Sequence, residues 1–359
     1  MTENKALILA KTPTGYPIPG EDLLIKSSTI DLNAAPPEGG LILKTHYLSY
    51  DPYQRGKMKP PNAGSYSQPY PLDTPVINAG ILRVISSSSP RFKTNDIVIG
   101  YVAFSEYQIV DAERAAKSAD QGGFDVLSNP FGLDEKLFLG ALGMSGLTAY
   151  SSLYEVGKPA KGETLFVSAA SGAVGQIVGQ LAKREGMKVI GSVGSEAKRK
   201  YIVEELGFDG AFNYKSEKPA EGLKRVLGEI GAKGVDVYYD NVGGEQLDAA
   251  LGLMNDRGRV VSCGSVSQTS LKPEDAYGVK NMPLVVGKRL TIRGFIVYDP
   301  DMGPKYTEEH QKNMQKWIKD GEITVKMSVT EGIENSAEGL VGMLKGENFG
   351  KAVLKVSDL

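Results

Sequence analysis

The stretch Thr164–Ala182, with the sequence TLFVSAASGAVGQIVGQLA, decides the fold. Its Leu165–Val167 portion is a short apolar run with the length of a buried strand. Apolar residues then recur at helical spacing, at Val174, Ile177, Val178 and Leu181. In the turn between them, Ala170, Gly172 and Gly175 occupy the three small positions of the dinucleotide-binding fingerprint, with Ala in place of the first Gly. Small residues let the backbone approach a pyrophosphate, and a helix N-terminus points N–H groups and its positive dipole end at that charge.

This motif has a second explanation, because small residues also serve the packing of a helix on a strand. The region that follows favours nucleotide binding. Three further stretches have the pattern of strands, with helical segments between them: Lys188–Gly194, Val235–Asp240 and Gly258–Cys263. Repeated βα units of this length imply a parallel sheet with right-handed crossovers. The sequence therefore predicts an α/β fold with a Rossmann, doubly wound parallel sheet.

The end of the second predicted strand indicates which nucleotide binds. An NAD enzyme usually ends this strand with Asp or Glu, which binds the ribose 2′-hydroxyl. Here Gly194 and Ser195 end the strand, the first acid is Glu196, and the cations Lys198–Lys200 follow. A carboxylate would repel a 2′-phosphate, whereas a cation such as Lys198 attracts it. The cations also suit the solvated start of a helix, but the missing acid favours NADP(H) over NAD(H) in either case.

Length and composition indicate a soluble protein of two domains. The chain has 359 residues, which is enough for two sizeable cores. Its hydrophobic content of 41% and charged content of 23% are ordinary for globular proteins, and a formal net charge of −2 offers no surface for nucleic acid or an anionic membrane. No apolar run reaches the roughly 18 residues of a membrane-spanning helix, and residues 1–5 lack the pattern of a signal peptide. With a single cysteine, the protein is expected to be cytoplasmic.

Histidine and cysteine are too few for a zinc enzyme. A structural zinc site takes four Cys or His ligands, and a catalytic site takes three protein ligands. The chain contains only Cys263, His46 and His310, which lie far apart in the sequence. We therefore predict no metal site, and we expect each histidine at the surface or in packing.

The region before the βα units differs from them in character. Residues 1–130 contain short apolar runs separated by Pro and Gly clusters, which predicts a β-rich domain with a boundary near residue 130. The expected strands are 6–9, 40–49, 80–86, 96–100 and 107–110. The small residues of 140–150 predict a helix start, which either packs closely on its neighbours or lies against the nicotinamide end of the cofactor.

The region after the βα units begins with the polar segment Ser265–Lys288. This segment follows a strand on the cofactor side of the predicted sheet, where substrate contacts are common, and it contains Gln268 and Tyr277. A further strand is expected over 288–298, helices over 310–320 and 336–345, and a last strand over 350–356. Because this last strand comes after the parallel sheet has ended, we expect it to return to the first domain.

Motifs along nearly the whole chain match one family. They are LSYDPYQR at 48–55, GMSGLTAY at 143–150, AASGAVG at 169–175, GFD at 207–209 with FNYK at 212–215, DNVGG at 240–244 and GENFGK at 346–351. The chain resembles the zinc-independent medium-chain dehydrogenases/reductases and, within them, the NADPH-dependent alkenal/one double-bond reductases, a group that includes the prostaglandin reductases (leukotriene hydroxydehydrogenases). The resemblance implies a GroES-like substrate domain over 1–130, completed by 311–359, a Rossmann NADP(H)-binding domain over 131–310, and a homodimer.

The resemblance also implies residues for each part of NADPH. It assigns Gly172–Gly175 to the pyrophosphate, Lys198 to the 2′-phosphate and Tyr214 to the adenosine phosphate region. The cofactor-binding residues that it implies are Thr148, Gly172, Ala173, Val174, Gly175, Gly194, Ser195, Lys198, Tyr214, Asn241, Cys263, Gly264, Phe295, Val297 and Asn348.

The implied reaction is the conjugate reduction of an α,β-unsaturated aldehyde or ketone. NADPH delivers a hydride to the β-carbon, the α-carbon takes a proton, and negative charge develops on the carbonyl oxygen as an enolate. A hydrogen-bond donor aimed at that oxygen is often the largest catalytic contribution. Without a metal, a tyrosine hydroxyl or the nicotinamide ribose hydroxyl must serve, and Tyr53 of the Asp-Pro-Tyr motif is the first candidate. The alternative for Tyr53 is a core phenol bonded to backbone.

The proton donor for the α-carbon stays open at this point. Many relatives in this group carry a tyrosine directly after a Ser-Gln pair, but here Ser267-Gln268 is followed by Thr269. Tyr277 of the same segment is the candidate in its place, and water is the alternative. The expected substrate contacts are Tyr53, Tyr66, Tyr70, Gln268 and Tyr277, of which Tyr66 and Tyr70 are alternatively exposed loop aromatics.

Other functions share these features. A quinone oxidoreductase has the same fold and cofactor and would act on quinones but not on enals. An enoyl-thioester reductase is also consistent with the sequence. A catalytically silent NADPH-binding protein, acting as a redox sensor or a structural component, would bind NADPH without turnover.

Overall fold

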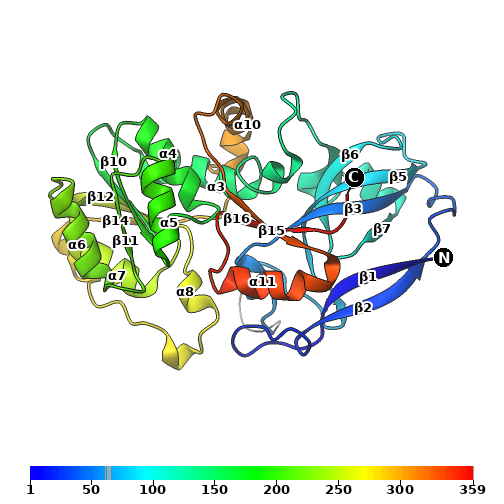
Figure 1. The fold of residues 1–359 in the computed structure, drawn as a ribbon, viewed down its shortest axis with the longest axis horizontal. Helices are drawn as coiled ribbons and strands as arrows, with labels where there is room; N and C mark the ends of the chain where they lie inside the picture. The colour runs from blue at the N-terminus through cyan, green and yellow to red at the C-terminus, as the bar shows by residue number, and fades with distance from the viewer. Residues whose placement is uncertain (61, 63–65, 359) are drawn as a thin grey trace. The chain divides into compact units, whose positions relative to one another are not determined.

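The structure, a computed structural model, describes residues 1–60, 62 and 66–358 (Figure 1). The chain divides into two compact units. Met1–Leu139 and Met327–Leu359 together form one, here called the discontinuous unit, and Gly140–Lys326 forms the other, the inserted unit. The inserted unit contains a six-stranded parallel sheet, and the discontinuous unit contains a seven-stranded and a three-stranded sheet. The predicted fold class, a Rossmann sheet domain with a second, β-rich domain, is confirmed.

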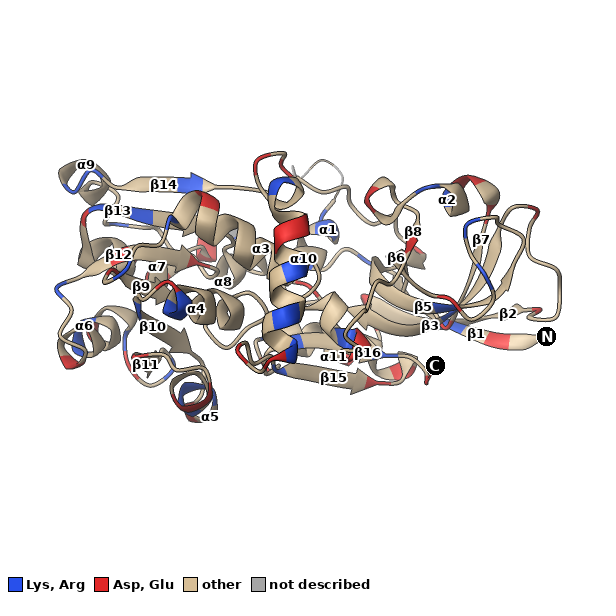
Figure 2. Ribbon diagram, turned by 90° about the horizontal axis from the view of Figure 1, so that it is seen from above, with Lys and Arg blue, Asp and Glu red and all other residues tan. Residues whose placement is uncertain are grey.

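Packing sets the limits of the two units, which differ from the predicted limits near 130 and 310. The short helix η2 (Glu135–Leu139) packs on β3 (Leu41–Ser49) and β5 (Ile77–Ser87), which keeps it in the discontinuous unit. Helix α10 (Gly303–Lys319) packs on α3 (Met144–Ser152) in the inserted unit. Both Lys and Glu residues lie along α10 (Figure 2). Its buried residues include His310 and Met314, and α10 is the helix predicted over 310–320, with an earlier start.

The strand order in the sheet of the inserted unit reverses at one strand near its middle. Its order is β11-β10-β9-β12-β13-β14, and all pairs are parallel. The strands are β9 (Thr164–Val167), β10 (Lys188–Val193), β11 (Gly210–Asn213), β12 (Val235–Asp240), β13 (Met254–Ser262) and β14 (Thr291–Gly294). The chain adds β10 and β11 on one side of β9 and β12 to β14 on the other. Ligands of such sheets bind outside the carboxyl ends of the strands at this switch point.

Helices cover both faces of this sheet because its strand residues alternate in direction. Helices α6 (Pro219–Glu229) and α7 (Gly244–Leu253) pack side by side (Figure 1). They share one buried cluster with Phe166, Ile190 and Tyr238 of the sheet. Helix α4 (Gly175–Arg184) packs on β9 and β10. The remaining helical segments of this unit are η3 (Leu153–Gly157), α5 (Glu196–Lys200), η4 (Tyr201–Glu205), α8 (Val266–Thr269), η5 (Pro273–Asp275) and α9 (Leu284–Gly287).

The strand predicted over 288–298 is wrong in its length, because β14 covers only Thr291–Gly294. Asp299 ends it. The Asp299 Oδ2 atom accepts the Ile296 N–H at 2.9 Å, and the Asp299 N–H donates to the Ile296 carbonyl at 2.9 Å. These two hydrogen bonds close a turn where a ladder would otherwise continue, and local apolar patterning does not reveal such a turn.

The discontinuous unit joins both ends of the chain. Its larger sheet has the order β15-β16-β3-β5-β6-β8, with β7 paired to β3, and its smaller sheet has the order β2-β1-β4. The other strands are β1 (Thr2–Leu9), β2 (Leu23–Ile30), β4 (Thr74–Pro75), β6 (Ile97–Ala103), β7 (Tyr107–Val110), β8 (Phe124–Val126), β15 (Met327–Glu331) and β16 (Lys351–Lys355). The helical segments are α1 (Tyr53–Lys57), α2 (Ala112–Ala116), η1 (Ala119–Gln121), η6 (Ile333–Asn335) and α11 (Ser336–Leu344). Strand β16 pairs antiparallel with β3, which confirms the predicted return of the last strand to the first domain.

One apolar core holds this unit together. It combines Leu7 of β1, Leu43 of β3 and Phe104, which follows β6, with Leu340 of α11 and Leu354 of β16. Each of these side chains is at most 1% exposed. Burying a leucine or phenylalanine side chain stabilises a fold by about 1.5–3 kcal/mol. The C-terminal segment is therefore part of the core and not an appendage.

Candidate active site

The turn after β9 forms a cradle of small residues, and its last position, Gly175, leaves no room for a side chain. Ala169 adopts a left-handed backbone conformation with φ of 49°, and the Gly172 N–H donates to its carbonyl at 2.9 Å. A Cβ atom on Gly175 would lie 2.4 Å from the Ala169 carbonyl oxygen and 2.8 Å from the Ala170 Cα atom. Gly175 is therefore required for the close approach of α4 to the turn.

The start of α4 suits an anion. The structure describes every residue of its first turn, and none of them is acidic. The first N–H groups of a helix have no acceptor within the helix, and they carry its positive dipole end. Gly172, Ala173 and Val174 lie in the turn directly before α4 and Gly175 is its first residue, so the structure brings these four predicted residues together. Their arrangement fits the pyrophosphate of a dinucleotide.

Two lysines, Lys198 and Lys215, lie near each other after the end of β10. Ser195 caps α5, since its hydroxyl accepts the Lys198 N–H at 3.3 Å. A Cβ atom on Gly194 would lie 2.8 Å from the Tyr214 hydroxyl and 3.4 Å from the Lys215 side chain. Burial, together with the positive charge of Lys215, lowers the pKa of Lys198. An anion such as a 2′-phosphate would compensate two neighbouring ammonium groups.

The carboxyl ends of β9, β12 and β13 meet beside the cradle. The Asn241 side chain donates to the Ser168 carbonyl at 2.8 Å. The N–H groups of Cys263 and Gly264 each donate to the Asp240 carbonyl at 2.9 Å. Burial raises the pKa of the Cys263 thiol to about 12, so this cysteine stays protonated near neutral pH. Asn241, Cys263 and Gly264 thus lie together, as predicted cofactor contacts at one edge of the sheet.

Three other predicted cofactor residues of the inserted unit lie in α3 and after β14. The Thr148 hydroxyl donates to the Met144 carbonyl of its own helix at 2.7 Å. Helix α3 packs on α4 and α10, and a Cβ atom on Gly146 would lie 1.8 Å from the Ala141 carbonyl oxygen, so close packing alone requires that glycine. Phe295 is half-buried and Val297 is buried. The contact of these residues with a cofactor stays a prediction.

The segment Ser265–Lys288 is anchored by Asp248 of α7. The Tyr277 hydroxyl donates to Asp248 Oδ2 at 2.9 Å, and the Lys280 and Asn281 N–H groups donate to Oδ1 at 2.9 and 2.7 Å. The Tyr277 N–H donates to Gln268 Oε1 at 2.8 Å, so the two predicted residues of this segment lie together. The hydrogen bond to Asp248 raises the pKa of the Tyr277 phenol.

The other predicted site residues belong to the discontinuous unit. Tyr53 begins α1, and its hydroxyl lies 2.5 Å from Asn78 Oδ1. Tyr70 is only 6% exposed and donates to the Ile77 carbonyl at 2.6 Å, so it is not an exposed loop aromatic, whereas Tyr66 is 71% exposed. Burial raises the pKa of Tyr70. Asn348 donates to the Gly350 carbonyl at 2.6 Å.

Comparisons with known proteins identify the family. One family model, described as the N-terminal domain of oxidoreductase, matches residues 5–118, and another, described as zinc-binding dehydrogenase, matches residues 173–315. The NADP-dependent oxidoreductase RED1 of Cochliobolus heterostrophus is 49% identical over 359 residues, which cover 100% of this chain and 99% of RED1. The chain belongs to the medium-chain dehydrogenase/reductase family. The predicted family is therefore confirmed.

Two further relatives of this medium-chain dehydrogenase/reductase are informative. The 2-alkenal reductase (NADP(+)-dependent) of Nicotiana tabacum is 39% identical over 356 residues, which cover 99% of this chain and 98% of that protein. The crystal structure of CurA in complex with NADPH, from Vibrio vulnificus, has a TM-score of 0.87 with 31% identity, and the match covers 99% of this chain and 100% of CurA. The similarity extends from end to end, so both units share it.

The metal-binding potential of this medium-chain dehydrogenase/reductase is a separate question, because one matching model is named for zinc. Within residues 1–60, 62 and 66–358, no group of three or more His, Cys, Asp or Glu side chains could hold a metal ion. The buried His310 Nε2 atom lies 2.9 Å from the Ala141 carbonyl oxygen, and His46 Nδ1 contacts the Ser357 carbonyl. Both histidines are buried, and each has a ring nitrogen in contact with a backbone carbonyl. In the same part of the chain, no helix is long and apolar enough to cross a membrane.

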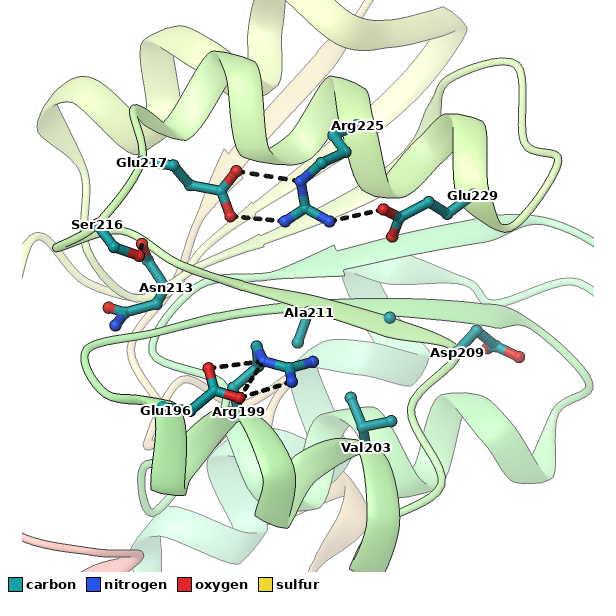
Figure 3. Close-up of a pocket in the computed structure, with 11 residues that line it drawn as sticks. Glu196, Arg199, Val203, Asp209, Ala211, Asn213, Ser216, Glu217, Arg225 and Glu229 are labelled. Carbon is teal, nitrogen blue, oxygen red and sulfur yellow. Dashed lines mark hydrogen bonds and ion pairs between the residues drawn. The ribbon is translucent and has the colours of Figure 1, made fainter.

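A pocket of about 520 Å³ lies beside β11, among residues of α5 and α6 (Figure 3). Arg225 pairs with Glu217 and Glu229, and Arg199 pairs with Glu196, so carboxylates neutralise both guanidinium groups. None of the predicted site residues is among the residues that line this pocket. It is therefore distinct from the cradle at the start of α4.

Sequence reasoning missed two residues of the candidate site. Lys215 lies beside Lys198, and the FNYK motif at 212–215 contained it as a signal. Asp248 lies within α7, which also contains Glu245, and an acidic residue of a helix resembles any solvent-exposed helical carboxylate, so its sequence context carried no signal.

Proposed function

We propose that this chain, an NADP-dependent oxidoreductase of the medium-chain dehydrogenase/reductase family, reduces the C=C bond of α,β-unsaturated aldehydes and ketones. The observation that carries the proposal is its end-to-end similarity to a 2-alkenal reductase, of which it covers 98% at 39% identity. The candidate nucleotide site supports NADPH as the cofactor, because Lys198 and Lys215 lie together where a ribose-binding acid would stand in an NAD enzyme.

Bound NADPH would supply the hydride that adds to the β-carbon of the substrate. Lys198, Lys215 and Ser195 would hold its 2′-phosphate, and the N–H groups at the start of α4 would hold its pyrophosphate. Gly175 keeps α4 close to the turn, so these N–H groups are aimed before the cofactor arrives. Such preorganisation reduces the entropic cost of binding.

The new C–H bond at the β-carbon pushes the electron pair of the C=C bond onto the carbonyl oxygen. We propose Tyr53 as the donor that stabilises this enolate. The Tyr53 hydroxyl would turn from Asn78 to the substrate oxygen. The α-carbon then takes a proton, and the carbonyl is restored. Tyr277 is one candidate for that proton, but its hydroxyl is bound to the Asp248 carboxylate, which favours water.

We further propose that two copies associate and that the protein is cytoplasmic. Strand β14 is an edge strand of the parallel sheet, and Ile292, Ile296 and Tyr298 on and after it are 38%, 37% and 57% exposed. An exposed apolar edge supports pairing with a second copy. A single cysteine supports a reducing compartment.

The test is NADPH oxidation with an enal, an enone, a quinone and a simple aldehyde, with NADH in parallel. Consumption of NADPH with the enal or enone, and a product that retains its carbonyl group, would support the proposal. Turnover of the quinone alone would replace it with a quinone oxidoreductase. Measurable NADPH binding without any turnover would replace it with a silent NADPH-binding protein. Size-exclusion chromatography with light scattering tests the dimer.

A further inference from the structure

A buried polar chain in the discontinuous unit leads from a charged pair to Tyr53. The Lys351 Nζ atom lies 2.5 Å from Asp51 Oδ1. The second carboxylate oxygen of Asp51 accepts Asn78 Nδ2 at 3.0 Å, and Asn78 Oδ1 lies 2.5 Å from the Tyr53 hydroxyl. Lys351, Asp51 and Asn78 are 1%, 4% and 0% exposed. An ammonium, a carboxylate and an amide are therefore enclosed behind one phenol.

The sheet brings these residues together across a long sequence separation. Strand β3 lies between β16 and β5, and Asp51 follows the end of β3. The antiparallel register pairs Val353 of β16 with Ser49, and the Tyr50 N–H donates to the Ala352 carbonyl at 3.2 Å. The same register continued by two residues sets Lys351 opposite Asp51. Asn78 comes from β5, on the other side of β3.

The Asn78 amide has one orientation that satisfies its neighbours. Its Nδ2 atom donates to the Ser49 carbonyl at 2.8 Å and to Asp51. Its Oδ1 atom accepts the Ala79 N–H at 2.8 Å and the Tyr53 hydroxyl. A flipped amide would set its oxygen against a carbonyl and a carboxylate and its NH₂ group against the Ala79 N–H. The neighbours thus determine that an acceptor faces Tyr53.

A buried ion pair needs a reason beyond stability, because the cost of desolvating two charges often equals their attraction. Here the carboxylate has three donors: the ammonium of Lys351, the Asn78 amide, and the Ser49 hydroxyl at 2.5 Å. The Lys351 ammonium pairs with one carboxylate oxygen of Asp51, and the other oxygen accepts the Asn78 amide. The pair therefore acts on Tyr53 through Asn78.

We infer that Asn78 is a positioning residue for Tyr53, and that the Asp51–Lys351 pair fixes the Asn78 amide for this purpose. The inference rests on the proposed function, in which Tyr53 stabilises the enolate. Asn78 holds the phenol oxygen in place, and the substrate oxygen then competes with Asn78 Oδ1 for the same proton. The reacting donor is thereby prepared before the substrate binds.

The kinetic test compares Asn78→Ala and Asp51→Asn, each in the wild-type and the Y53F background. Asp51→Asn preserves the volume but sets an amide NH₂ against either Asn78 Nδ2 or Lys351 Nζ, so it disturbs the chain without a cavity. We expect both variants to lower kcat with an enone roughly tenfold or more, with little change in the KM for NADPH. In the Y53F background they should cause no further fall.

The control is Gln108→Ala, which removes another buried amide of the same unit. Gln108 donates to the Ala103 carbonyl at 3.0 Å and to the Ser105 hydroxyl at 2.7 Å, and it has no part in the chain from Lys351 to Tyr53. Its kcat should stay near that of the wild type. An equal loss in this variant, or an equal loss in the two Tyr53 backgrounds, would show a merely structural role and overturn the inference.

A spectroscopic measurement separates this inference from the proposed function and does not require turnover. 3-Fluorotyrosine at position 53 reports the hydrogen bond of the phenol through its ¹⁹F resonance. Asn78→Ala and Asp51→Asn should shift this resonance and Gln108→Ala should not. A shift in a protein that reduces no enone would retain the hydrogen-bonded chain and reject the function. An unchanged resonance in both variants would reject the chain itself, even if enone reduction is observed.

Discussion

The substitution Lys198→Ala tests how the protein distinguishes NADPH from NADH. Lys198 follows the cap of α5, and its ammonium lies near that of Lys215, whose charge helps to lower the Lys198 pKa. A 2′-phosphate between them would gain one charge-assisted hydrogen bond from each. Such a bond contributes about 1.5–3 kcal/mol, or roughly 10- to 150-fold in binding. NADH has a hydroxyl at this position and gains no ion pair.

The expected magnitude lies toward the lower end of that range. Lys198 is half-buried, so water screens part of its attraction, and Lys215 remains in the variant. Removal of Lys198 also removes the repulsion between the two ammonium groups. We therefore expect the dissociation constant of NADPH to rise roughly 10- to 30-fold, and that of NADH to change by less than about twofold.

The assay is fluorescence titration of each variant with NADPH and with NADH at fixed ionic strength. Lys200→Ala is the matched control, because Lys200 is an exposed lysine of the same helix. It should bind both cofactors like the wild type. A similar loss of NADPH and NADH binding in Lys198→Ala would refute the reasoning, since it would show a disturbed fold or a role outside the 2′-phosphate.

Three further predictions follow from local geometry. Gly175→Ala forces a Cβ atom against the Ala169 carbonyl, so we expect a loss of roughly 1–3 kcal/mol in the free energy of unfolding and weaker binding of both cofactors. The control is Gly228→Ala in α6, where a Cβ atom meets nothing within 4 Å, and a denaturant titration should show its free energy of unfolding to rise by up to about 1 kcal/mol. Asp248→Asn should speed amide hydrogen exchange across 277–281, because the ionised carboxylate accepts the N–H groups there, and unchanged exchange would contradict the anchoring role. Burial lowers the pKa of His310 from 6.5 to about 4, so its contribution to stability is present above pH 6.5 and is lost as the pH falls toward 4. The loss is about 3 kcal/mol, and H310Q should remove this part of the pH dependence measured by urea unfolding; an unchanged slope would contradict it.

Features encoded by adjacent residues were predictable from the sequence. The strand, small-residue turn and helix of 164–182 and the parallel sheet follow from apolar periodicity and turn residues within short stretches. The preference for NADP(H) follows from residues 194–200, because a ribose-binding acid would stand at a known distance from the fingerprint. These features depend on local chemistry, which a short sequence window contains.

The tertiary structure decided which side chains meet. Lys351 reaches Asp51 because β16 pairs with β3 in one particular register, and a shift of one residue would turn Lys351 to the other face. Tyr277 contacts Asp248 because a loop folds back on α7. The hydroxyl of the buried Tyr70 donates to the Ile77 carbonyl. Such contacts depend on strand register and chain return over tens to hundreds of residues. The sequence therefore determined the fold and the cofactor class, whereas long-range packing determined the hydrogen-bond partners of the tyrosines on which the proposed chemistry depends.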